Sequence, residues 1–118
     1  MPRKILNKWE KIEATEYKRL MKIYSGLPKN KLAVAEGLIR QAARLRSRLD
    51  MLWSDLQDNG ETELFTQSVN TDPYERERPA SRTFTATDKS YQSIIKQLNE
   101  LCPEAEEQDA LAAFMNDG

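Results

Sequence analysis

Histidine is absent from this chain of 118 residues, and cysteine occurs once. Without histidine, the most common general base in enzymes and the most common zinc ligand are both missing. A single cysteine excludes an internal disulfide and a cysteine-based metal site, so we expect Cys102 to pack as a small apolar residue. These absences lead us to expect neither a cofactor nor a metal.

Sequence patterns of catalysis are also missing. The chain has only four glycines, none of them in a phosphate-binding loop that ends in lysine, and no serine lies in a recognisable nucleophile motif. The carboxylates Asp50, Asp55 and Asp58 come without the Glu-x-x-His pattern of carboxylate metal centres. We interpret them as solvated side chains and expect that the protein is not an enzyme.

Long hydrophobic runs are missing as well. No window approaches the roughly 18 to 20 consecutive apolar residues that a membrane span requires. The start, Met1-Pro2-Arg3-Lys4, leads into no apolar signal core. We therefore expect a cytoplasmic protein that makes no membrane contact.

Charge is what the chain has in abundance, and it is sorted by position. Residues 1–48 carry thirteen Lys or Arg against four Glu, whereas residues 49–118 carry five against fifteen Asp or Glu. A basic half attracts phosphates by releasing counterions, and an acidic half repels nucleic acid or attracts a basic protein. Solvated faces of ordinary helices would also be charged, so both interpretations stay open.

Apolar spacing predicts an all-α protein. A helix over residues 4–24 ends at Ser25-Gly26-Leu27-Pro28, where Gly26 can take a positive φ and Pro28 cannot continue a helix. From 29 to 58 the apolar residues follow alternating steps of three and four, and Asn59-Gly60 ends the pattern. These apolar residues, which we call the seam, are Ala35, Leu38, Ala42, Leu45, Leu49, Leu52 and Leu56.

Residues 61–82 predict a polar connector, with a short extended piece at Leu64-Phe65-Thr66. A last helix is expected from Thr87 or Asp88, either of which can cap it, to Leu101 before Pro103. Two long helices joined in this way should fold back as an antiparallel helical hairpin. The predicted architecture is an N-terminal helix, a long antiparallel helical hairpin and a flexible acidic C-terminal tail.

We divide the chain into a basic N-terminal helix and turn (1–28), a helical hairpin that forms the oligomerisation core (29–103) and an acidic tail (104–118). Ile39, Ala43 and Trp53 widen the apolar face beyond a two-helix seam, which favours contact with more than one neighbour. A homo-oligomer, closed into a ring, is therefore expected.

Two sets of residues are candidates for binding. Leu111, Phe114 and Met115 could anchor the acidic tail in the groove of a partner, or they could fold back on the helical hairpin. Arginines 40, 44 and 48 recur every four residues and form what we call the arginine stripe, a possible phosphate track. The arginines could instead pair with acids of a neighbouring helix or subunit. The full set of candidate DNA-binding residues is Lys4, Lys8, Lys11, Lys18, Arg19, Lys22, Lys29, Lys31, Arg40, Arg44 and Arg48.

The order of segments resembles a known family. A helix over 32–56 ends in Asp58-Asn59-Gly60 and is followed by Phe65-Thr66-Gln67-Ser68 and by Tyr74-Glu75-Arg76-Glu77-Arg78-Pro79. The run Asp88-Lys89-Ser90-Tyr91-Gln92-Ser93-Ile94-Ile95-Lys96-Gln97-Leu98 comes next, and Leu101-Cys102-Pro103 closes the sequence. Over most of residues 15–103 this order is similar to that of short bacteriophage small terminase subunits of the P27 type.

The resemblance implies a function in DNA packaging within the cytoplasm of the host cell. Small terminases bind double-stranded viral DNA, assemble into rings and regulate the large terminase subunit, which holds the ATPase and the nuclease. The chain departs from the pattern because the turn at Ser25 to Pro28 joins two long helices, with no separate helix-turn-helix domain. The alternative from another class is a helical structural or adaptor protein that binds a protein partner without touching DNA.

Overall fold

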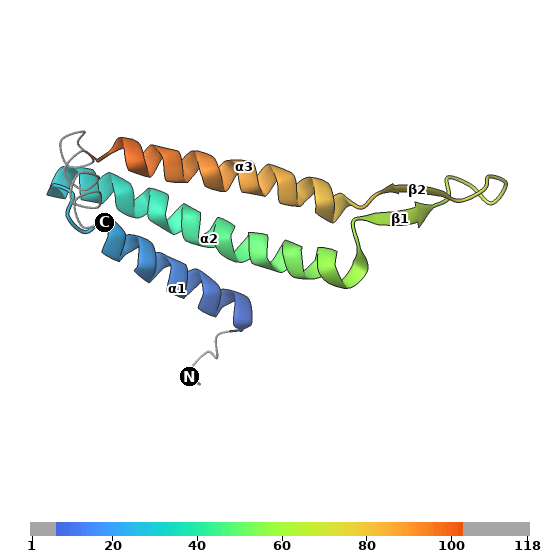
Figure 1. Cartoon of the computed structure of the whole chain (residues 1–118), viewed down its shortest axis with the longest axis horizontal. Coiled ribbons are helices and arrows are strands. Elements are labelled where there is room, and N and C mark those ends of the chain that lie inside the picture. The colour runs from blue at the N-terminus through green and yellow to red at the C-terminus, as the bar shows by residue number, and fades with distance from the viewer. Residues whose placement is uncertain (1–6, 103–118) are drawn as a thin grey trace, which may run out of the picture.

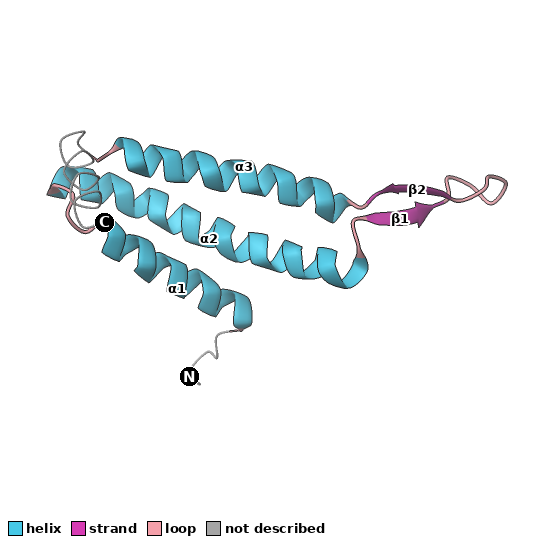
Figure 2. Ribbon diagram, in the orientation of Figure 1, coloured by secondary structure: helices cyan, strands magenta, loops and turns pink. Residues whose placement is uncertain are grey.

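The structure, a computed structural model, describes residues 7–102. These residues are mostly helical and include one small antiparallel sheet of two strands (Figures 1 and 2). The helical class predicted from the sequence is confirmed at this level. In chain order the elements are α1 (Lys8–Ile23), α2 (Lys29–Asn59), β1 (Thr62–Phe65), β2 (Tyr74–Glu77) and α3 (Pro79–Glu100).

Helix α1 begins at a side-chain cap. The side-chain oxygen of Asn7 accepts a hydrogen bond from the backbone N–H of Glu10 at 2.9 Å, which satisfies one of the unpaired donors of the first turn. The turn after α1 differs from the expectation, because Gly26 does not take a positive φ. The backbone N–H of Leu27 instead donates to the carbonyl of Tyr24 at 3.2 Å. This bond closes the turn without a left-handed residue.

The core lies where the three helices meet. Helix α2 packs against α1 on one side and α3 on the other, and Ala35, Ile39 and Ala42 are fully buried between them. Leu20 of α1 and Leu98 of α3 contribute to the same cluster. The small side chains early in the seam allow this close approach of three helices.

Helix α1 covers only part of α2. The hydroxyl of Ser47 donates to the carbonyl of Trp9 at 2.5 Å, so the first turn of α1 lies level with the middle of α2. The apolar width from which we predicted a second neighbour is thus partly buried by α1, which packs on Ala43 and Ser47. Trp53, beyond this level, is 50% exposed and packs against Phe84 of α3 with the two rings tilted and their centroids 5.7 Å apart.

The connector is a β-hairpin, which we define as residues 62–77. Its strands pair antiparallel with Thr62 opposite Glu77 and Phe65 opposite Tyr74, and it extends past the ends of α2 and α3 (Figure 1). Strand β1 contains Leu64 and Phe65 of the predicted extended piece but ends before Thr66, and the second strand was missed. Strand β2 is exposed along its whole length, so burial leaves no alternating pattern in its sequence.

Helix α3 begins at Pro79, eight residues before the predicted start at Thr87. Pro79 occupies the first helical position, where its fixed φ suits the helix and its missing N–H costs nothing. Thr87, buried at 8% exposure, and Asp88 both lie inside the helix, so the prediction that one of them caps it was wrong. The threonines between 83 and 87 obscured the helical pattern.

Among the helices of residues 7–102, none is long and apolar enough to cross a membrane.

Candidate nucleic-acid interface

The arginine stripe lies exposed along α2. Arg40, Arg44 and Arg48 are all exposed, and each is about 6 Å further along the helix axis than the one before. Arg40 lines one hollow between α1 and α2, while Arg44 and Arg48 line the next. The stripe therefore forms the α2 rim of a groove, which we call the arginine groove.

The α1 rim of the arginine groove carries charges of both signs. Glu10 and Glu13 line both hollows, and Lys18 lines the hollow that contains Arg40. Lys8 belongs to the first turn of α1, where its ammonium lies 4.9 Å from the ring centre of Trp9. Net positive charge is thus concentrated on the α2 rim.

Arg40 is partly neutralised within the chain. Its guanidinium forms an ion pair with Glu36 one turn earlier and lies 5.0 Å from the ring centre of Tyr17 on α1. The Tyr17 hydroxyl also donates to Glu36 at 3.0 Å. The hydrogen bond from Arg40, followed by that from Tyr17, lowers the pKa of the Glu36 carboxyl below its usual value. A phosphate would have to compete with this carboxylate for Arg40.

Arg44 and Arg48 differ from Arg40 in having no such partner. Within residues 7–102 neither guanidinium forms an ion pair. Trp9 and Met51 lie in the same hollow and give it an apolar wall. These two arginines are the strongest candidates for contact with an external anion.

Arg19 serves a structural role instead. Its guanidinium donates to both carboxylate oxygens of Glu16, at 2.6 and 2.9 Å, and the hydroxyl of Tyr91 on α3 donates to the same carboxylate at 2.6 Å. Glu16 is only 6% exposed. The hydrogen bond from Arg19 outweighs burial and lowers the pKa of Glu16. This carboxylate joins α1 to α3.

The remaining candidates do not gather in the arginine groove. Lys11 lines a different hollow, with Arg46 and Asp50. Lys22, Lys29 and Lys31 belong to the last turn of α1 and the first turn of α2, at the far end of the helices from the β-hairpin (Figure 1). The candidates Lys4, Leu111, Phe114 and Met115 lie outside the described residues.

Two arginines that the sequence did not single out take part in the polar structure. Arg46 pairs with Asp50 at 2.7 Å and lies 5.4 Å from the ring centre of Tyr91, so it is on a half-buried side of α2 that is turned toward α3. The sequence does indicate that Arg46 is separate from the arginine stripe. It lies two residues from both Arg44 and Arg48, and a step of two residues turns a side chain to another face of a helix.

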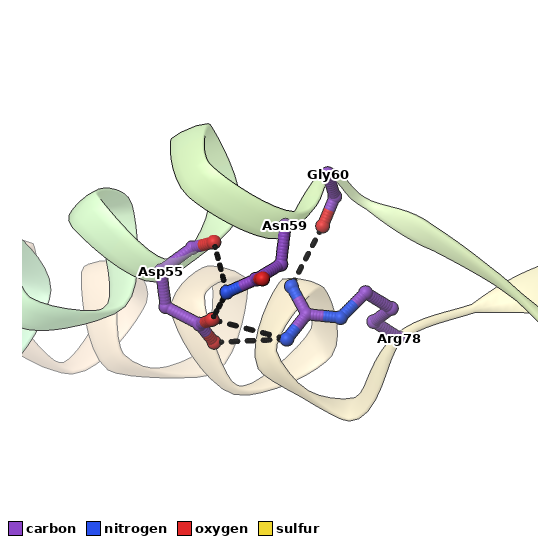
Figure 3. A network of polar contacts seen from close by, with 4 residues as sticks. All are labelled: Asp55, Asn59, Gly60 and Arg78. Atoms are coloured by element: carbon purple, nitrogen blue, oxygen red, sulfur yellow. Dashed lines mark hydrogen bonds and ion pairs between the residues drawn. The ribbon is translucent and has the colours of Figure 1, made fainter.

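Arg78 is the second, and it joins the end of α2 to the start of α3 (Figure 3). One nitrogen donates to both carboxylate oxygens of Asp55 at 3.1 Å, and another donates to the carbonyl of Gly60 at 2.7 Å. The side-chain amide of Asn59 donates to Asp55 at 2.6 Å. The hydrogen bonds from Asn59 and then from Arg78 lower the pKa of Asp55. We call these four residues the Arg78 clamp.

The chain matches no model of a protein family, and it has no significant match among curated proteins or solved structures.

Proposed function

We propose that the protein is a small terminase subunit: a non-enzymatic, oligomeric DNA-binding protein that recognises viral DNA and regulates the large terminase during packaging. The proposal combines the resemblance of residues 15–103 to the P27 type with the charges of the arginine groove. In this proposal α2 and α3 form an antiparallel helical hairpin that carries subunit contacts. The acidic residues 104–118 would engage the large terminase through Leu111, Phe114 and Met115.

The observation that carries the proposal is the exposed pair Arg44 and Arg48, which has no ion pair within the described part of the chain. Guanidinium groups bind phosphate oxygens in a bidentate manner and keep their charge at all accessible pH values. Arg44 and Arg48 lie about 6 Å apart along the axis of α2, and each strand of a duplex carries a phosphate about every 3.4 Å along the duplex axis, so each arginine can contact its own phosphate.

The proposed binding is electrostatic and weakly selective for sequence. Arginines in a stripe contact phosphates, which fix position, whereas sequence is read through side chains that reach base edges. Acidic groups such as Glu10 and Glu13 on the opposite rim would keep DNA on the α2 side of the groove. This division of charge supports a defined track rather than a general coating of nucleic acid.

The test is to replace Arg44 and Arg48 together by alanine. Two phosphate contacts are then lost, so affinity for duplex DNA should fall and the slope of log K against log salt should flatten by about two. The matched control replaces Lys89 and Lys96, two exposed lysines of α3, which removes the same charge from another element. Fluorescence anisotropy with labelled duplex DNA measures both variants.

The outcome separates the two classes of function. If both double variants bind DNA equally well, the arginine groove is not the interface. If neither the wild type nor the variants bind DNA at low salt, the adaptor alternative replaces the packaging function.

A further inference from the structure

The β-hairpin combines acidic residues with exposed apolar side chains. Together with Glu61 at its base, the β-hairpin contains five acidic residues and one arginine. Leu64 is 73% exposed, Val69 is fully exposed and Tyr74 is 46% exposed. Two-stranded hairpins are marginally stable on their own in water, so a projecting hairpin with apolar side chains gains stability when it is covered.

The direction of the β-hairpin is nevertheless fixed by its own chain. The Arg78 clamp holds its base through Asp55 and Gly60, and the backbone N–H of Arg78 donates to the carbonyl of Glu61 at 2.8 Å. Further along, Arg76 pairs with Glu63 at 2.8 Å and stacks 3.6 Å above the ring of Phe65. The hairpin therefore has a fixed shape without being part of the core.

At the opposite end of the molecule, α1 and α2 carry the opposite charge. We call residues 17–35 the basic corner: the end of α1, the turn and the start of α2 (Figure 1). The basic corner contains five Lys or Arg and no Asp or Glu. Lys22, Lys29 and Lys31 form no ion pair within residues 7–102. Ile23 and Val34 at this end are 57% and 58% exposed.

Two of these lysines also lie where a helix disfavours positive charge. Lys29 and Lys31 belong to the first turn of α2, which has no acidic residue and no side-chain cap. The N-terminus of a helix carries a partial positive charge, so an acidic neighbour would be stabilising there. The basic corner therefore offers both charge and exposed apolar side chains to an acidic, apolar surface.

We infer that the β-hairpin of one copy docks on the basic corner of a second copy, head to tail. The acidic residues Glu61, Asp72 and Glu75 would face Lys22, Lys29 and Lys31, and Leu64 and Val69 would cover exposed apolar side chains of the corner. This inference rests on the proposed function for one point, that the protein self-associates, and it adds which two surfaces meet. It leaves the arginine groove open for DNA.

A second copy is the partner that the charges favour. The two surfaces lie at opposite ends of α2, about 46 Å apart for a helix of 31 residues, so one chain cannot join its own ends. Contacts of this heterologous kind close into a ring when the rotation between copies allows it.

A charge swap tests the contact. The hairpin variant carries Glu61→Lys, Asp72→Lys and Glu75→Lys, and the corner variant carries Lys22→Glu, Lys29→Glu and Lys31→Glu. Each variant alone has two ends of like charge, so its self-association should weaken about tenfold or more. A 1:1 mixture restores opposite charges at every contact and should associate again. Sedimentation equilibrium of the full chain measures all three samples, and circular dichroism checks folding.

The DNA measurement keeps this inference separate from the proposed function. The hairpin variant retains every basic residue of the arginine groove, so its salt-dependent binding to DNA, measured at protein concentrations where the wild type is monomeric, should persist. Loss of association with preserved DNA binding supports the docking. A wild type that does not bind DNA would overturn the proposed function, but the result on docking would still hold.

Three outcomes would overturn the docking. A wild type that stays monomeric at about 100 micromolar has no such contact. A corner variant that associates like the wild type shows that the hairpin binds elsewhere, for example to another hairpin. A mixture that fails to associate shows that the two surfaces do not meet, as would follow if acidic residues 104–118 occupied the corner instead.

A neutral variant guards against misfolding of the charge-swapped chains. Leu64→Ser and Val69→Ser remove apolar contact area from side chains that are exposed in the single chain. The thermal unfolding of the helices should stay unchanged while self-association weakens. Unchanged self-association in this variant would also contradict the docking.

Discussion

At the scale of single residues, Gly60 marks the point where the chain leaves α2. Its φ of 81° and ψ of 173° lie in a region that is essentially restricted to glycine. Its carbonyl also accepts from Arg78 at 2.7 Å, so the backbone cannot relax without loosening the clamp. The sequence predicted the end of the helix at Asn59-Gly60, because a glycine directly after a long helical pattern is a common stop signal.

Gly60 and Gly37, the latter inside α2, give a matched pair of variants. Gly60→Ala should lower the free energy of unfolding by about 1 to 3 kcal/mol because alanine is strained at this φ and ψ. Gly37→Ala should raise it by about 0.5 to 1 kcal/mol, since a Cβ at this helical position meets no atom within 4 Å. Urea unfolding measures both. Equal effects of the two substitutions would contradict the strain at Gly60.

Glu16 makes stability depend on pH. Its pKa is lowered in the folded chain, chiefly by the hydrogen bond from Arg19, so folding favours the ionised carboxylate. This contribution is fully present above the unfolded value of 4.5 and is lost as the pH falls through the lowered folded value. The contacts of α1 with α3 should therefore weaken in acid.

The variant Glu16→Gln should lower the free energy of unfolding by about 1.5 kcal/mol at pH 7, because hydrogen bonds to a charged group are lost. The difference from the wild type should shrink below pH 4.5 as the wild-type carboxyl takes up its proton. Glu100→Gln, at an exposed position, serves as the control. A difference that stays constant down to pH 2, roughly, would show that Glu16 acts through packing alone.

At the scale of elements, the sequence predicted those whose buried residues recur at a regular spacing. Helix α2 was predicted within one residue of its observed bounds because its buried side chains recur at helical spacing. Strand β2 and the first two turns of α3 were missed. β2 is held by cross-strand pairs such as Arg76 with Glu63, and Pro79 was interpreted as part of a connector although it begins the helix.

The Arg78 clamp predicts how the β-hairpin behaves when its base is loosened. In Arg78→Lys one ammonium cannot reach the Asp55 carboxylate and the Gly60 carbonyl with the same geometry. Hydrogen exchange at the amides of β1 and β2 should become several-fold faster, while the amides of α2 before residue 50 keep their protection. Arg82→Lys is the matched control, because Arg82 is 85% exposed and pairs weakly with Glu77 at 3.5 Å. Unchanged exchange in Arg78→Lys would show that the clamp does not support the hairpin.

At the scale of the whole molecule, the fold turns a charge division along the sequence into a division in space. The acidic β-hairpin and the basic corner lie at opposite ends (Figure 1). The arginine groove lies between them, along α1 and α2. The sequence predicted the arginine stripe from its spacing of four residues. The ion pairs Glu36–Arg40 and Glu16–Arg19 join residues four and three positions apart within one helix, a spacing that favours such pairs in any sequence. The sequence could not predict that Tyr17 and Tyr91 of neighbouring helices donate to the same carboxylates, because these contacts depend on how the helices pack.

The most direct test of the central claim, that this protein binds DNA through the phosphates, is the salt dependence of wild-type binding to duplex DNA. The association constant, measured between roughly 50 and 200 mM salt, should fall linearly on a log–log plot with a slope of about −2 or steeper, as expected when Arg44 and Arg48 release counterions from at least two phosphates. A protein that does not bind duplex DNA at the lowest salt, or whose affinity does not change over this range, would contradict the account.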